Sequence, residues 1–254
     1  MTRYAFFLGG RDLEMVTIAA LLQARQAAGD GRIAQVADAG LQWGARVSDY
    51  GPQIAAAAAR GEVPVLVELA ADVPLPPGTV EIDHHGSRSG EPPALRQVLD
   101  LLALPGADWT REMELVAAND TGHVAGMRAV GATDDEIRRI RAADRAAQGI
   151  TAQEEAEGLR ALAARRAALE GTLWVIRLNH GRSATVADPL ALTGDGRDLL
   201  LLSPASTQFF GAGARVARLD AAFPGGWRGG ALPQRGFWGL ARPMDEAAVL
   251  AALV

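Results

Sequence analysis

The stretch Glu81-Ile82-Asp83-His84-His85-Gly86 decides how the rest of the chain is interpreted. It continues a short apolar run that starts at Val80 and predicts a buried strand. Two of the four histidines of the chain stand side by side here, directly after an aspartate. A carboxylate and two imidazoles at a strand end can point into one cleft, where they make a metal site of hard-to-borderline character.

The composition limits the class of protein. The 254 residues suffice for one large domain or two small ones. The net charge of -5 argues against duplex DNA as a partner. Cysteine is absent, so any metal must be held by His, Asp or Glu. No apolar run is long enough for a membrane span and the first residues do not fit a signal peptide, so we expect a cytoplasmic protein with no membrane partner.

Acidic residues follow two of the strands predicted in the first half of the chain. Asp12 and Glu14 come after the first strand, and Glu68 closes a later one, although a strand emerging into water also explains Glu68. Alternating strands and helices predict a parallel α/β sheet, whose ligands lie beyond the carboxyl ends of its strands. The expected strands are residues 4–8, 33–36, 64–69 and 80–82, and the expected helices are residues 13–28 and 52–60.

The middle of the chain is predicted to be helical. Helices are expected at residues 93–103 and 111–118, and Asp120-Thr121-Gly122 follows the second. That tripeptide also fits a plain turn at a helix end. Thr133 and Thr151 each stand three residues before a glutamate, which is typical of a capping box. We therefore expect two more helices between 134 and 170, broken at Gly149.

A second, smaller α/β unit is predicted from Thr172 onward. A glycine-rich loop, Gly225-Gly226-Trp227-Arg228-Gly229-Gly230, precedes its last strand and closing helix. Glycines let backbone N–H groups approach an anion closely, and Arg228 adds a charged donor. The expected strands are residues 173–178, 183–187, 199–202 and 237–241, and the expected helix is residues 245–253.

The acids and histidines at element ends form a candidate metal centre. Several carboxylates with one or two imidazoles suit Mn²⁺ or Mg²⁺, and suit Zn²⁺ less well. One or two such ions can activate a water and neutralise the charge of a phosphoryl group. The contributing residues are Asp12, Glu14, Glu68, Asp83, His84, His85 and Asp120.

The order of these segments resembles the DHH phosphoesterase superfamily. Its four motifs correspond to Asp12-Leu13-Glu14, Glu68, Asp83-His84-His85 and Asp120-Thr121-Gly122. The resemblance implies catalysis by Asp83, His84 and His85, with His85 contacting the scissile phosphate. It also implies metal ligands Asp12, Glu14, Glu68, Asp83, His84 and Asp120.

The resemblance extends to the second unit, which is similar to a DHHA1-like substrate-binding domain. It implies a parallel-sheet catalytic domain at 1–148, a helical connector at 149–171 and a mixed α/β domain at 172–254, with the active site in the cleft between them. The substrate would contact Gly225, Gly226, Trp227, Arg228 and Gly229. It would be a small phosphoester, such as a short oligonucleotide, a dinucleotide or a nucleotide monophosphate. A homodimer is compatible with this scheme.

Four positions depart from the superfamily pattern. Leu8 replaces a usual histidine, Glu14 and Glu68 replace aspartates, and Trp227 stands where the loop usually carries a histidine. Two alternatives therefore stay open. One is a nucleotide-binding or regulatory protein on a degraded scaffold. The other is an inorganic pyrophosphatase, which the loss of the histidine at Leu8 disfavours.

Overall fold

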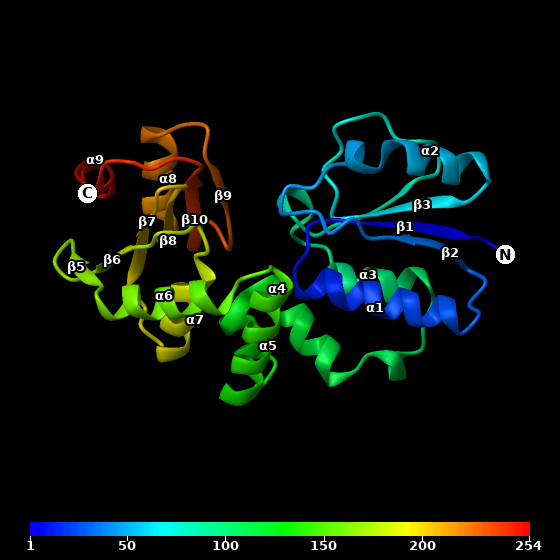
Figure 1. The fold of residues 1–254 in the computed structure, drawn as a ribbon, viewed down its shortest axis with the longest axis horizontal. Coiled ribbons are helices and arrows are strands. Elements are labelled where there is room, and N and C mark those ends of the chain that lie inside the picture. Colours follow the sequence, from blue (N-terminus) through cyan, green and yellow to red (C-terminus); the bar gives the residue numbers. More distant parts are fainter. The chain divides into compact units, whose positions relative to one another are not determined.

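The computed structural model describes residues 1–254, apart from the side chain of Ser87. The chain forms two compact units, Met1–Gly149 and Ile150–Val254 (Figure 1). Among the residues that the structure describes, no helix combines the length and hydropathy needed to span a bilayer. Both units are α/β structures, as the sequence predicts.

The first unit is built on an all-parallel sheet with strand order β2-β1-β3-β4. From β1 the chain moves to β2 on one side of it, and it then crosses to β3 and β4 on the other side. Such a reversal opens a crevice at the carboxyl ends of the two inner strands. The strands are β1 (Tyr4–Leu8), β2 (Ile33–Ala37), β3 (Val63–Val67) and β4 (Val80–Ile82).

Helices cover both faces of this sheet. α2 (Gly51–Ala59) lies on one face, and α1 (Leu13–Ala27) and α3 (Ala94–Leu101) lie on the other (Figure 1). Alternate residues of β1 point to opposite faces, so Ala5 and Phe7 pack with the α2 side of the core. Short 3-10 helices occur at Val47–Tyr50, Gly86–Arg88 and Gly106–Asp108.

The long helix α4 (Arg111–Ala129) runs beyond the end expected at residue 118, but it is kinked. His123 has non-helical torsions there, with φ 52° and ψ −142°. The kink brings the backbone of Gly126 against the carbonyl of Ala118, where a Cβ would meet the oxygen at 2.3 Å. The bend therefore depends on a residue without a side chain, and Asp120 lies within it.

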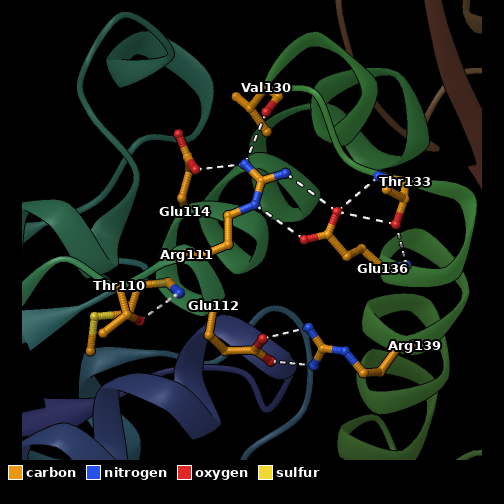
Figure 2. Close-up of polar contacts among 9 residues, drawn as sticks. Thr110, Arg111, Glu112, Glu114, Val130, Thr133, Glu136 and Arg139 are labelled. Carbon is orange, nitrogen blue, oxygen red and sulfur yellow. Dashed lines mark hydrogen bonds and ion pairs between the residues drawn. The ribbon is translucent and has the colours of Figure 1, made fainter.

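The next helix, α5 (Asp134–Ala147), packs against α4 and α1. Thr133 caps it in the expected capping box with Glu136. Exposed ion pairs join α4 to α5: Arg111 contacts Glu136, and Arg139 binds both oxygens of Glu112 (Figure 2).

The second unit has a mixed six-stranded sheet in the order β5-β6-β7-β8-β10-β9, in which β6 and β7 are parallel. In β7, Leu200 and Leu202 pack toward α8 and α9, whereas Leu199 and Leu201 pack toward α6 and α7. The elements are α6 (Ala152–Ala163), β5 (Arg166–Ala168), β6 (Leu173–Arg177), α7 (Ala184–Thr193), β7 (Asp198–Leu202), β8 (Thr207–Ala212), α8 (Gly213–Ala222), β9 (Trp227–Gly229), β10 (Arg235–Leu240) and α9 (Glu246–Leu253).

The second unit differs locally from the sequence prediction. Residues 183–187, predicted as a strand, mostly form the start of α7, because Val186 and Leu190 bury one helical face against the sheet. The glycine-rich segment is not a loop throughout, since Trp227–Gly229 pairs with β10 as an edge strand. The helical connector expected at 149–171 contains α6 and β5, both of which belong to the second unit.

The close approach at the α4 kink generates a stability prediction. We expect Gly126→Ala to lower the free energy of unfolding by about 1–3 kcal/mol, because its methyl group has no room beside the Ala118 carbonyl. Gly122→Ala is the matched control in the same helix, since a Cβ there meets nothing within 4 Å. It should be neutral or slightly stabilising. Urea denaturation compares the two, and equal losses would contradict the role given to the kink.

Candidate metal centre

The candidate metal centre lies at the carboxyl edge of the parallel sheet. The segments that follow β1, β3 and β4 contribute to it, together with the kinked helix α4. β1 and β3 are the strands between which the chain order reverses. The fold thus brings the acidic residues to the crevice where parallel sheets hold ligands.

The start of α1 supplies two of the predicted acids, which have different roles. Asp12 is the N-cap of the helix, and its Oδ1 accepts a hydrogen bond from the Met15 N–H at 2.8 Å. Glu14 is 1% exposed, and its Oε1 accepts from the Leu95 N–H at 3.0 Å. The second oxygen of Glu14 remains available and points into the centre.

Glu68 follows β3 with a backbone conformation that non-glycine residues rarely adopt. Its φ is 53°, and its N–H donates to the Ile82 carbonyl at 2.8 Å. The loop after β1 passes so close that a Cβ on Gly9 would meet the Glu68 carbonyl oxygen at 2.4 Å. Such strained torsions cluster at functional sites, where the surrounding structure holds them in place.

His84 is the residue on which the acids converge. Its Nε2 lies 2.7 Å from Asp120 Oδ2, 3.1 Å from Glu68 Oε1 and 3.8 Å from Glu14 Oε2. One ligand atom from each of these four residues lies within 4.8 Å of every other.

The same four atoms are buried, and none makes a regular hydrogen bond within the described part of the chain, although His84 Nε2 lies at ion-pair distance from Asp120 Oδ2 and Glu68 Oε1. Buried polar atoms almost always have a partner, and an exception calls for an explanation such as an ion. Three carboxylates and one imidazole are ligands suited to Mn²⁺, and a cation would satisfy all four atoms at once. The residues present therefore fit a divalent metal ion.

Without a cation, the cluster shifts the pKa values of its members. Burial, reinforced by the charges of Asp120 and Glu68, raises the pKa of Glu14 to about 9. Burial also raises the pKa of Asp12 to about 8, partly offset by its hydrogen bond from Met15. For His84, burial lowers the pKa, but Asp120 and Glu68 outweigh it and raise the pKa to about 10.

Asp83 and His85 form a separate pair at the rim. His85 Nδ1 donates to Asp83 Oδ1 at 2.9 Å, and the His85 backbone N–H donates to the same oxygen at 2.9 Å. The His85 side chain is 56% exposed, and it joins Glu68 and His84 in a second group of converging ligand atoms. The Asp83 carboxylate lies outside both groups that the described residues form.

The structure thus divides the predicted site residues between a buried cluster, a pair at its rim and positions outside both. It brings Glu14, Glu68, His84 and Asp120 together, and it places His85 and Asp83 at the rim. Asp12 serves as a helix cap, and Leu8 is fully buried in the core.

The predicted substrate-binding segment belongs to the second unit and is ordered by packing. Gly225 has a φ of 89°, and a Cβ on Gly226 would meet the Gly239 carbonyl oxygen at 2.5 Å. Trp227 packs over Gly239, and Gly229 lies against the ring of Phe237. Arg228 pairs with Asp220 at 2.7 Å.

Sequence reasoning missed a polar cluster behind the metal centre. Asn119, Arg141 and Asp144 are buried and hydrogen bonded to one another. The sequence did indicate that these charged residues are buried, because Arg141 and Asp144 lie at helical spacing from Ile137 and Ile140, on the apolar face of α5.

No protein-family model matches the sequence, and no curated protein matches it. Solved structures match nearly the whole chain. The exonuclease RecJ bound to manganese is 14% identical, with a TM-score of 0.46 over 98% of this chain and 88% of that one.

RecJ from Thermus thermophilus in complex with Mn²⁺ is 14% identical, with a TM-score of 0.47; the alignment covers 99% of this chain but 51% of the RecJ chain. A DHH domain from a protein described as a member of a ribosomal protein family is 13% identical, with a TM-score of 0.39 over 99% of this chain and 75% of that one.

The raised pKa values predict that cation binding depends on pH. Glu14 and His84 are protonated at neutral pH in the metal-free protein, since their pKa values are about 9 and about 10. A cation requires both groups without their protons, so we expect Mn²⁺ affinity to rise from about pH 6 to about pH 9, with protons released on binding. Calorimetry in buffers of different ionisation enthalpy measures this release.

The metal-free protein should show the opposite trend in stability. Both folded-state pKa values exceed the ordinary values of 4.5 and 6.5, so their contribution to stability is complete at low pH and is lost as the pH rises toward 9 or 10. Mn²⁺ should reverse this loss. For the affinity prediction, an Mn²⁺ affinity that does not change with pH would show that Glu14 and His84 do not bind the cation.

Proposed function

We propose that the first unit is a divalent-metal-dependent phosphoesterase that acts on small phosphoesters. One observation carries the proposal: four buried ligand atoms, on Glu14, Glu68, His84 and Asp120, converge within 4.8 Å of one another. Oxygen-rich sites with an imidazole suit Mn²⁺ or Mg²⁺, the ions with which phosphoryl chemistry is most often associated.

Glu14, Glu68, His84 and Asp120 would hold one ion. When bound, the ion supplies positive charge that polarises a phosphoryl group and lowers the pKa of water. The cluster alone is anionic, so its carboxylates would repel a phosphate group. We therefore infer that phosphate binding at this edge depends on the cation.

His85 is suited to hold and move a proton at the rim. Its Nδ1 is engaged by Asp83, which orients the ring and leaves Nε2 to face a substrate. The Asp83 carboxylate also stabilises the ring when it is protonated, as an orienting acid does in catalytic dyads. We assign His85 the role of protonating the leaving oxygen, and Asp83 the role of positioning His85.

The substrate that we favour is a short oligonucleotide, a dinucleotide or a nucleotide monophosphate. The net charge of -5 disfavours a long polyanion. In the second unit, the Arg228 side chain is 54% exposed and pairs with Asp220. A phosphate group would compete with that carboxylate for the guanidinium, which makes Arg228 the candidate substrate contact of that unit.

Hydrolysis of bis-p-nitrophenyl phosphate tests the proposed function. We expect Mn²⁺-dependent hydrolysis that a chelator abolishes and added Mn²⁺ restores. Glu14→Gln should reduce activity at least about a hundredfold, because it removes a charged ligand from the buried centre. Glu112→Gln, an exposed change on α4, is the control. A protein that binds Mn²⁺ but hydrolyses neither this ester nor a dinucleotide would support the binding-protein alternative instead.

The role of His85 has its own test. We expect His85→Ala to lower kcat about 10²–10⁴-fold through loss of the proton donor. Mn²⁺ affinity should fall much less, since the four-atom cluster is intact without His85. Asp83→Asn should give a smaller loss in kcat, because it leaves the imidazole in place. Full activity of His85→Ala on an ester with a poor leaving group would exclude the proton-donor role.

A further inference from the structure

A buried ion pair on α5 lies behind the metal centre. Arg141 and Asp144 are 5% and 4% exposed, and Arg141 Nη1 lies 2.8 Å from Asp144 Oδ2. Removing two charges from water is costly, and apolar residues of similar volume often stabilise a fold as well or better. The location of this pair therefore calls for an explanation other than stability.

Each member of the pair holds an element that carries metal-ligand candidates. Asp144 Oδ1 accepts a hydrogen bond from the Leu13 N–H at 3.0 Å. Leu13 is the first residue of α1 and stands between Asp12 and Glu14. The anionic oxygen thus binds the first turn of the helix that presents Glu14.

On the other side, Arg141 Nη1 donates to Asn119 Oδ1 at 2.8 Å. Asn119 is 6% exposed and directly precedes Asp120 on the kinked part of α4. Gln148 Nε2 donates to Asp144 Oδ2 at 2.8 Å, which keeps that carboxylate in place. One buried network therefore connects the backbone beside Glu14 to the side chain beside Asp120.

The network lies between two candidate ligands that come from different helices. Glu14 Oε2 and Asp120 Oδ2 both point toward His84 Nε2. Metal–ligand distances must be met within about 0.2 Å, so a small shift of α1 against α4 weakens binding. Groups that orient ligands from behind typically change metal affinity about 10–100-fold when they are altered.

We propose that Arg141 and Asp144 are positioning residues of the metal centre, which join α1 to α4 and thereby set the affinity for the cation. The inference rests on the proposed metal-dependent function. It assigns no catalytic contact to either residue.

The test compares two Arg→Lys variants on the same helix. Arg141→Lys keeps a positive charge on α5, but its shorter side chain withdraws the donor from the position of Nη1, the one atom that contacts both Asn119 and Asp144. Arg139→Lys is the matched control, because Arg139 also connects α5 to α4, through Glu112, but at the exposed surface (Figure 2). Electron paramagnetic resonance of Mn²⁺ measures the dissociation constant and the spectrum of the bound ion, with no substrate present.

We expect Arg141→Lys to weaken Mn²⁺ binding about tenfold or more and to change the spectrum of the bound ion. Arg139→Lys should stay within about twofold of the parent. Asn119→Ser serves as a second variant if Arg141→Lys does not fold, because it leaves both charges in place and removes only the contact beside Asp120. It should weaken binding in the same direction.

Folded Arg141→Lys and Asn119→Ser proteins with the parent affinity would overturn the inference, and so would equal weakening by Arg139→Lys. A parent protein that binds no Mn²⁺ would instead overturn the proposed function. The two failures are thus distinct.

Discussion

Three carboxylates held close together around one buried imidazole are the constraint on which the first unit depends. Glu14, Glu68 and Asp120 would repel one another if all were ionised in the absence of a counter-charge, and burial deprives them of solvent screening. The metal-free protein meets this cost by proton uptake, which is why burial and neighbouring charges raise the pKa of Glu14 to about 9. A divalent cation meets the same cost with its own charge. The cluster is therefore stabilised either by bound protons or by a bound cation, and the metal concentration and the pH determine which of the two occurs.

Strained backbone torsions and buried polar contacts around the cluster hold its ligand residues in place. Glu68 and His123 have positive φ values at or beside ligand positions, and strain of this kind persists only where surrounding packing imposes it. Arg141 contacts both Asn119 and Asp144, although a buried arginine is rarely retained for stability alone. Strand ends thus hold one half of the centre, and helices whose spacing depends on buried hydrogen bonds hold the other. The exposed pairs between α4 and α5 are screened by water and contribute little to ligand geometry.

Local sequence patterns determined much of this protein. Apolar runs defined β1, β3 and β4, capping boxes defined the starts of α5 and α6, and the acids at strand ends indicated the edge where the centre lies. These signals are readable because each depends on residues near one another in the chain. The prediction of a strand at residues 183–187 was wrong. The β-branched residues Thr185 and Val186 favour a strand, but packing of the Val186–Leu190 face against the sheet favours α7.

Only the tertiary structure decided which acids meet. Asp12 and Glu14 are two residues apart, yet one caps α1 and the other enters the cluster, because the direction of a side chain depends on the turn in which it sits. Asp83 is one of the metal ligands that the sequence resemblance implies, but its carboxylate accepts hydrogen bonds from His85 at the rim. The kink that carries Asp120 and the buried polar network on α5 depend on contacts between segments distant in the chain. Such contacts arise from packing in three dimensions, which no local pattern encodes.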